Sequence, residues 1–542
     1  MRYAKQAGSA IGLCWMLLLS ACQTDTATPA STTTGEASLV ASTQNGPVRG
    51  VQGEGVIAFK GIRYGADTAQ TRFAAPQPPA AWDQVVAADT YGASCPQTPT
   101  GNPGGLFTSW RPDPTPSLSE DCLFLNVWTP ALADGGKRAV MVWLHGGGFA
   151  SGSGSSMAYE GSRLARRGDV VVVTINHRLN IFGYLALNHY GEGFEDSAVA
   201  GVLDMVQALE WVRDNVEAFG GDPDTVMIFG ESGGGAKVST LMNTAAAKGL
   251  FHRAVVQSGA MLRFPDAAGA QQKADQLVAN LGLTADTIQQ IKTMPLEQLD
   301  AAHQDTGAGS APTIDGRTLL RHPFAPDASP IGADVPMMLG TTRTESSLFL
   351  GAANPASFTL DWDGLHQALQ QTYPDKDVEA IVAGYRAIDA TLDPSDIYFE
   401  ATTDARWAAG HVTQAERKFA QAAAPTYLYL FNWDTPVDGG KWRSPHALEI
   451  GFVFDNVAYS QSMSGSGDEQ QRVADILSET WIAFAKTGDP NNAMIPQWPA
   501  YDTSDRAVMV LDVEPQVVND ARGAQRRLLN EGDAYGNRYQ QR

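Results

Sequence analysis

One short segment constrains the fold more than any other part of the chain: Phe229-Gly-Glu-Ser-Gly-Gly-Gly-Ala-Lys-Val238. An apolar run, 225–229, precedes it and a helix-compatible run, 236–242, follows it, so Ser232 lies in a G-x-S-x-G turn between a buried strand and a helix. Glycines on both sides relieve the steric clash of so sharp a turn. A flexible Gly/Ser linker is a poor alternative, because a strand and an amphipathic helix do not flank such linkers. The segment therefore predicts a tight turn that holds a serine nucleophile.

Apolar and β-branched runs recur along the chain and suit strands that are buried on both faces. They lie at 139–144, 170–175, 225–229, 254–256, 336–339, 427–431 and 508–511. Segments with helical period separate them, the clearest at 199–219 before Gly220-Gly221 and at 473–484 before Gly488. Alternating strands and helices predict an α/β fold, with a large, mostly parallel sheet covered by helices on both faces.

Two segments have helical patterns with few strand signals, at about 266–305 and 358–423. We expect them to be insertions that form a cap over the active site. Residues 39–542 contain no long polar linker and no repeat, so they are predicted to be one catalytic domain.

Charge excludes one class of partner. The 542 residues include 59 acidic and 38 basic side chains, for a formal net charge of −21. This charge would repel nucleic-acid phosphates, so we expect no nucleic-acid partner. An H-E-x-x-H motif or a cluster with metal-ligand spacing would favour a metal-dependent hydrolase. The sequence has neither, and we expect no metal and no cofactor.

The N-terminus is typical of an export signal. Arg2 and Lys5 precede the apolar run 10–19, which is too short to span a bilayer. The stretch Leu19-Ser-Ala-Cys22 resembles a bacterial lipobox, which predicts a lipoprotein signal peptide at 1–21 and lipid on Cys22. Residues 22–38 are predicted to be a disordered tether. The protein would then face the periplasm or cell exterior and contact the membrane only through this anchor; an ordinary signal peptide and a soluble secreted protein are the alternative.

Cysteine usage agrees with export. Cys14 would leave with the signal peptide and Cys22 would carry lipid, so Cys95 and Cys122 remain in the folded body. In an oxidising compartment these two are expected to form one disulfide, with two buried free thiols as the alternative. Closing a loop of this length would stabilise the fold by roughly 3.5 kcal/mol in the chain-entropy model.

A serine nucleophile needs donors for the negative charge that develops on the substrate oxygen. His145-Gly-Gly-Gly-Phe149 follows the predicted strand 139–144, so its glycine amides would lie at the carboxyl end of a strand. We expect the amides of Gly147, Gly148 and Gly233 to form an oxyanion hole. A plain glycine-rich turn is the alternative.

The serine also needs a base and an orienting acid, and in this fold they follow it in the order acid, histidine. His446 lies in a loop after the predicted strand 427–431, and Glu345 lies in a loop after the predicted strand 336–339. We therefore predict Glu345 as the acid and His446 as the base. Asp315, in a turn before glycine, competes with Glu345. The other histidines considered are too early, precede the acid or lie in helical patterns; they are His252, His303, His322, His366 and His411.

These residues match a known family: the sequence resembles the type-B carboxylesterases, which include cholinesterases and lipase-like esterases of the α/β-hydrolase fold. The resemblance covers almost all of the mature chain, at 61–64, 119–130, 145–149, 176–184, 219–223, 230–234, 257–259 and 446–454. It implies the triad Ser232, Glu345 and His446, and the oxyanion donors and the disulfide named above. It also implies that Glu231 and Ser258 lie near the triad.

Some residues depart from the family pattern. Gly233 stands where many members have alanine, and Arg63 where many have proline, but neither change removes a catalytic group. Trp110 lies inside the disulfide loop at a spacing that favours packing over cation binding. The predicted function is serine-dependent hydrolysis of small-molecule carboxylic esters through an acyl-enzyme. The alternative is a catalytically silent binding or adhesion protein with the same fold.

Overall fold

The computed structural model describes residues 39–98 and 101–530. The predicted signal peptide at 1–21, the predicted tether at 22–38 and Cys22 lie outside the described residues. Within the described ranges, every helix is too short or too polar to cross a bilayer.

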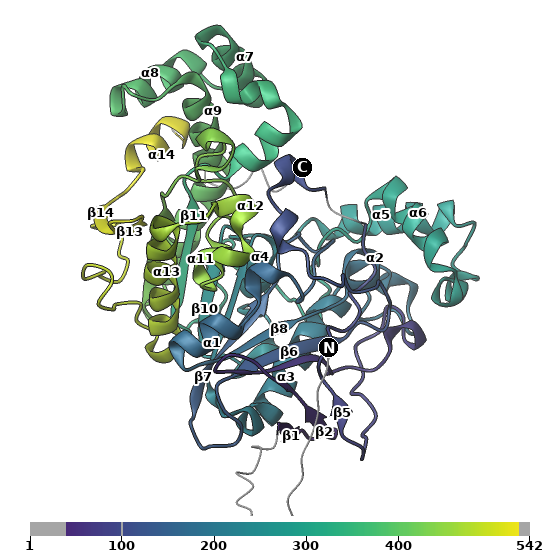
Figure 1. The fold of residues 1–542 in the computed structure, drawn as a ribbon. Helices are drawn as coiled ribbons and strands as arrows, with labels where there is room; N and C mark the ends of the chain where they lie inside the picture. Colours follow the sequence, from purple (N-terminus) through teal and green to yellow (C-terminus); the bar gives the residue numbers. More distant parts are fainter. Residues whose placement is uncertain (1–38, 99–100, 531–542) are drawn as a thin grey trace, which may run out of the picture. The chain divides into compact units, whose positions relative to one another are not determined.

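An 11-stranded sheet organises the fold (Figure 1). Its central strands run parallel, and each overlaps one of the predicted apolar runs. In spatial order they are β13 (Ala507–Leu511), β12 (Thr426–Phe431), β11 (Met337–Thr342), β10 (Arg253–Gln257), β9 (Gly221–Glu231), β7 (Arg138–Leu144) and β8 (Val171–Ile175). The predicted parallel centre of an α/β fold is confirmed.

Both edges of this sheet are antiparallel, so the sheet is mixed. β14 (Gln516–Asn519) pairs with β13 at one edge; at the other, β6 (Phe124–Thr129), β4 (Ile57–Arg63) and β3 (Val51–Gln52) follow β8. The sequence runs did not indicate these edge strands. β4 alternates buried and partly exposed residues, so it lacks the continuous apolar run of a central strand. A separate small sheet contains β1 (Val40–Ser42), β2 (Pro47–Arg49) and β5 (Val86–Ala87).

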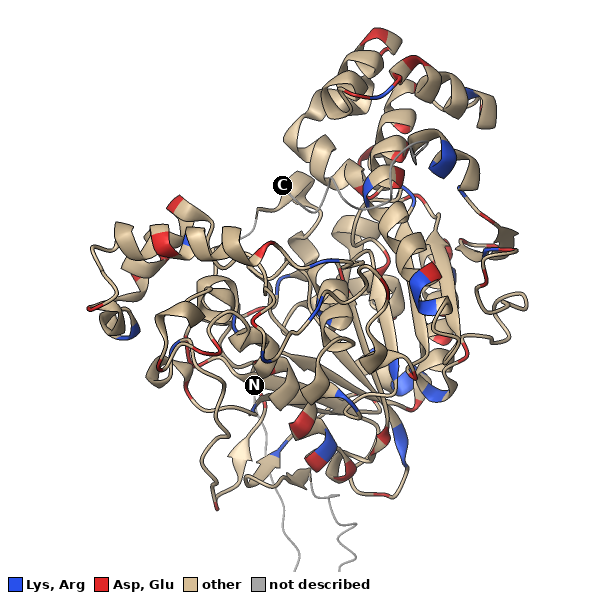
Figure 2. Ribbon diagram, turned by 180° about the vertical axis from the view of Figure 1, so that it is seen from behind, with Lys and Arg blue, Asp and Glu red and all other residues tan. Residues whose placement is uncertain are grey.

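Helices cover both faces because alternate residues of each strand point to opposite sides. In β7, Val140 and Val142 pack in one core with α3 (Ala200–Asn215) and α4 (Gly233–Leu241). Met141 and Trp143 pack in the other core with α1 (Ser162–Gly168) and α13 (Asp468–Thr487). Figure 2 shows the strands of the large sheet mostly without charged residues, as burial on both faces requires.

The two clearest helical predictions are confirmed, and glycines terminate both segments. α3 continues as a 3-10 turn, Val216–Phe219, and stops at Gly220 with a φ of 74°. α13 stops at Gly488, whose φ is 78° and whose N–H donates to the carbonyl of Phe484. Left-handed φ values favour glycine, which explains these stops. Other short helices are α2 (Asn180–Tyr184), α11 (Ile450–Val453), α12 (Gln461–Ser464) and α14 (Gly523–Asn530).

The segments predicted as insertions contain helices. The first holds α5 (Ala267–Asn280) and α6 (Leu296–Thr306); the second holds α7 (Trp362–Thr372), α8 (Val378–Ile388), α9 (Pro394–Thr403) and α10 (Ala409–Phe419). Figure 1 shows α5–α6 (teal) and α7–α9 (green) as two separate groups. α7–α9 have their own apolar cluster, which includes Leu365, Ile381 and Phe399.

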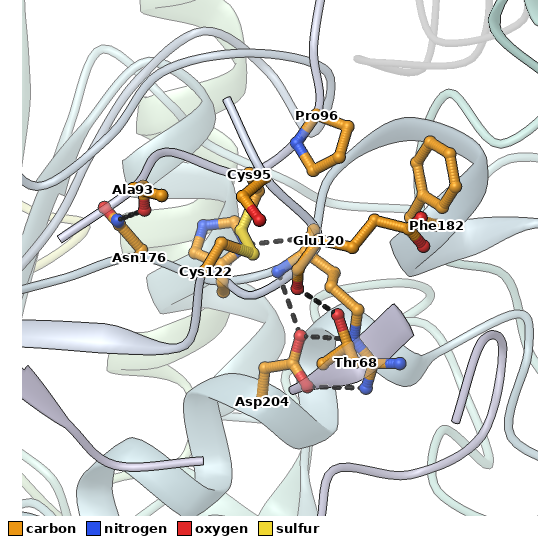
Figure 3. Close-up of a disulfide and its surroundings, with 12 residues drawn as sticks. Thr68, Ala93, Cys95, Pro96, Glu120, Cys122, Asn176, Phe182 and Asp204 are labelled. Carbon is orange, nitrogen blue, oxygen red and sulfur yellow. Dashed lines mark hydrogen bonds and ion pairs between the residues drawn. A yellow bond between two sulfur atoms is a disulfide. The ribbon is translucent and has the colours of Figure 1, made fainter. Parts of the chain in front are cut away.

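The structure contains the predicted disulfide between Cys95 and Cys122, with the two Cα atoms 5.0 Å apart (Figure 3). Both residues are buried, and Asn176 donates a nearby hydrogen bond of 2.9 Å to the carbonyl of Ala93. Trp110, inside the loop, is 9% exposed and packs edge-on against Phe107. This position agrees with a packing tryptophan.

Candidate active site

Ser232 occupies the sharp turn that its sequence predicts. β9 ends at Glu231, α4 begins at Gly233, and Ser232 between them has φ 57° and ψ −122°. Such a backbone costs roughly 1–3 kcal/mol in a residue with a side chain. The N–H of Ser232 donates to the carbonyl of Gln257 on β10 at 2.8 Å, which helps hold the turn. The serine is partly exposed, so a substrate can approach it.

The predicted oxyanion donors come together beside this turn. Gly147 and Gly148 are exposed and have left-handed φ values of 82° and 62°. Among the described residues, neither amide has a hydrogen-bond acceptor. Gly233 is the first residue of α4, so its N–H has no partner within the helix. A Cβ on Gly233 would lie 2.4 Å from the nitrogen of Gly148, so an alanine here would require this loop to move.

Glu345 and His446 lie far apart in the chain, and reciprocal hydrogen bonds join their loops. The N–H of Thr344 donates to the carbonyl of Ser444 at 3.1 Å, and the N–H of Ser444 donates to Oγ1 of Thr344 at 2.9 Å. Nδ1 of His446 then lies 2.5 Å from Oε2 of Glu345, while the other carboxylate oxygen accepts the N–H of Thr342 at 2.8 Å. The structure thus brings the predicted acid and base together.

The other imidazole nitrogen faces the residue before the serine. Nε2 of His446 lies 3.1 Å from Oε1 of Glu231 and has no hydrogen-bond partner among the described residues. Burial, and then the charge of Glu345, raises the pKa of Glu231 well above its ordinary value. In the described part of the chain, Nε2 makes no hydrogen bond to the hydroxyl of Ser232. Serine–histidine hydrogen bonds are often loose before substrate binds.

Ser258, the second residue implied to lie near the triad, follows β10 and has a φ of 50°. Its N–H donates to the carbonyl of Gly340 on β11 at 2.8 Å. Its hydroxyl is buried without a hydrogen-bond partner in the described part of the chain. Ser258 directly follows Gln257, whose carbonyl accepts the N–H of Ser232, so it lies next to a residue that stabilises the nucleophile turn.

The competing acid and the other histidines make contacts of their own. Asp315 accepts hydrogen bonds from three backbone amides of its own turn, the shortest from Leu319 at 2.7 Å. Each of the other candidate histidine rings forms a hydrogen bond with a backbone group; these rings belong to His252, His303, His322, His366 and His411. Within 39–98 and 101–530, no group of three or more His, Cys, Asp or Glu side chains has the arrangement of a metal site.

The chain matches the carboxylesterase family over residues 37–529. It belongs to this family. It is 35% identical over 504 residues to a para-nitrobenzyl esterase of Bacillus subtilis, covering 90% of this chain and 98% of that protein. It is 34% identical to a phenmedipham hydrolase of Pseudarthrobacter oxydans, covering 88% of this chain and 95% of that protein. A solved carboxylesterase from Geobacillus stearothermophilus superposes with a TM-score of 0.78 at 35% identity, covering 91% and 100% of the two chains.

The predicted family and fold are therefore confirmed: the protein is a carboxylic-ester hydrolase with the α/β-hydrolase fold. Its site also contains residues that the sequence did not indicate. Glu449 is fully buried, and burial with the charges of Glu231 and Glu345 raises its pKa to about 8. It lies three residues after His446, just before α11, but nothing in the sequence marks it as part of a buried group of carboxyls.

Two aromatic residues of this carboxylesterase flank the imidazole. The rings of Phe349 and Trp407 stack, and their centroids lie 4.9 and 6.2 Å from that of His446. Both lie in π-helical turns, Ser347–Gly351 and Asp404–Ala408, the second within the helical segment at 358–423. A sequence pattern with ordinary helical period could not indicate that these rings would meet at the base.

Proposed function

We propose that this carboxylesterase acts through a Ser-Glu-His triad, with Ser232 as the nucleophile, His446 as the base and Glu345 as the orienting acid. The observation that supports the proposal most directly is the 2.5 Å contact between Nδ1 of His446 and Glu345. A carboxylate on Nδ1 selects the tautomer in which Nε2 can accept a proton. The positive φ of Ser232, at the end of a strand, adds support, because it is the backbone of a nucleophile turn.

In the proposed mechanism Ser232 attacks the ester carbonyl while Nε2 of His446 takes the hydroxyl proton. The amides of Gly147, Gly148 and Gly233 stabilise the oxyanion. The imidazolium then gives its proton to the leaving alcohol, and an acyl-enzyme remains. Water attacks this ester with the same base, and its breakdown releases the acid and regenerates the serine.

The stacked rings of Phe349 and Trp407 support a preference within the ester class. Phe349 is 44% exposed and beside the base, so it offers an apolar aromatic surface to one side of a bound ester. We infer that esters with an aromatic acyl or alcohol group are accepted. A structural relative from Clostridium hathewayi, 34% identical with a TM-score of 0.78, is described as hydrolysing aliphatic aromatic polyesters.

A hydrolysis panel with a covalent probe tests this function. Purified mature protein should hydrolyse p-nitrophenyl and benzyl esters, and peptide mass spectrometry should find a fluorophosphonate label on Ser232. Aromatic esters should have higher kcat/KM values than alkyl esters of equal length. Folded protein that takes up no probe and hydrolyses no ester would instead be the silent binding protein considered as the alternative.

We also propose that the protein is exported and anchored by lipid on Cys22, on the basis of the signal-like N-terminus and the sequence Leu19-Ser-Ala-Cys22. Expressed in a bacterium with its own N-terminus, the protein should fractionate with membranes, and Cys22→Ala should move it to the soluble exported fraction. Membrane association that is unchanged by this substitution would contradict the anchor.

A further inference from the structure

A buried lysine lies beneath the loop that carries the proposed oxyanion donors. Lys237 is fully buried on α4, and its Nζ donates a hydrogen bond of 2.8 Å to the carbonyl of His145. The ammonium lies 5.6 Å from the ring centre of Phe149. It forms no ion pair with a carboxylate in the described part of the chain. Burial of an ammonium group without a counter-charge is costly, so packing alone is a poor explanation for lysine here.

The helix geometry explains how the ammonium arrives at this place. Lys237 follows Gly233 by four residues, so the two lie on the same face of α4. Side chains on a helix slope toward its N-terminus, which directs Lys237 back toward the nucleophile turn. The same face contacts the loop, because a Cβ on Gly233 would lie 2.2 Å from the oxygen of Gly148. The ammonium of Lys237 thus binds His145, the first residue of the glycine loop. Gly148, the last glycine of that loop, contacts Gly233 at the start of α4.

The groups around the ammonium carry no negative charge. The rings of His145 and His177 stack with centroids 4.8 Å apart, and both are buried. Burial lowers the pKa of each imidazole well below its ordinary value, and the charge of Lys237 lowers it further. Both rings are therefore neutral at physiological pH. Nδ1 of His145 lies 2.9 Å from the carbonyl oxygen of Gly146, which ties this ring to the same loop.

We propose that Lys237 is a positioning residue for the oxyanion hole: its ammonium group holds the carbonyl of His145, which fixes Gly147 and Gly148 against Gly233, and adds positive potential where negative charge develops. The inference rests on the proposed function, since the loop has this role only if its amides bind the oxyanion. Positive charge in a low-dielectric site stabilises such an anion much more than it would in water.

The state of the lysine depends on pH. Burial lowers the pKa of Lys237 to about 7. The ammonium form is therefore present below this pKa and is progressively lost as the pH rises through it. Of the groups that face Nζ, the two imidazoles stay neutral and Phe149 does not titrate. A pH effect that depends on Lys237 should therefore follow the lysine.

The test compares wild-type protein with Lys237→Met, which removes the charge at similar length, and with Lys237→Arg, which keeps it. For a p-nitrophenyl ester, we expect Lys237→Met to lower kcat by about 10-fold to 100-fold with little change in KM, because the oxyanion hole acts in the transition state. The inhibition constant of a trifluoromethyl ketone, which forms a tetrahedral adduct, should rise by a similar factor. Lys237→Arg should recover part of both losses.

The ratio of wild-type kcat to Lys237→Met kcat should be largest near pH 6. It should fall toward one at about pH 9, because the wild-type ammonium loses its proton. If Lys237→Met does not fold, the smaller variant Lys237→Ser is judged by the same ratio.

Equal kcat, inhibitor affinity and pH profile in folded Lys237→Met would overturn the inference and leave the proposed function intact, provided that both proteins take up the fluorophosphonate probe. A parallel rise in KM with unchanged kcat would also overturn it, because that result indicates lost ground-state binding. Wild-type protein that neither takes up the probe nor hydrolyses esters would refute the proposed function, and this inference with it.

Discussion

Ser232→Ala should lower kcat for p-nitrophenyl ester hydrolysis by about 10⁶-fold, the loss typical of a serine nucleophile. Alanine cannot form the acyl-enzyme, so the amides of Gly147, Gly148 and Gly233 would act only on a slow attack by water. The partly exposed position of Ser232 lets alanine replace it without creating a cavity in the core. Steady-state kinetics and fluorophosphonate labelling measure the loss, and thermal denaturation checks the fold.

Ser504→Ala is the matched control, because Ser504 is an exposed serine in a loop between Tyr501 and β13. It should keep wild-type kcat and labelling. Wild-type turnover by folded Ser232→Ala, or a label that remains on the variant, would show that another residue is the nucleophile.

Glu345→Gln should lower kcat by about 10⁴-fold with little change in shape, as expected when the orienting acid of a triad becomes an amide. In the wild-type protein, the buried carboxylate of Glu345 accepts hydrogen bonds from Nδ1 of His446 and from the N–H of Thr342. An amide can accept from Thr342 only by turning its NH₂ toward Nδ1, which forces the proton of the neutral imidazole onto Nε2. The ring then cannot take the proton of Ser232.

Asp315→Asn tests the competing acid with the same chemical change. The side chain of Asp315 accepts hydrogen bonds only from backbone amides of its own turn in the described part of the chain. This variant should therefore keep wild-type kcat and lose at most some local stability. Kinetics over a pH series for both variants decide between the two acids. A large loss of kcat in Asp315→Asn with full activity in Glu345→Gln would reverse the assignment.

The chain order of the proposed triad could be predicted because each member follows a buried strand. Parallel strands end at the same edge of a sheet, so loops after β9, β11 and β12 lie close together even when 101 residues separate Glu345 from His446. The antiparallel strands β3, β4 and β14 escaped prediction because exposed positions interrupt their apolar runs, and the buried Asn126 interrupts the apolar run of β6. The aromatic pair of Phe349 and Trp407 escaped it because π-helical turns do not follow the ordinary helical period.

The sequence by itself determined the nucleophile turn, the parallel centre of the sheet and the candidate acid and base, since each depends on local pattern or on strand order. The disulfide was expected because only two cysteines remain in the folded body. Only the tertiary structure decided which groups surround them. It places Nε2 of His446 beside Glu231, buries Glu449 close to Glu231 and Glu345, and places Lys237 beneath the glycine loop. These contacts depend on close packing between distant segments, and burial then determines which groups keep their charge.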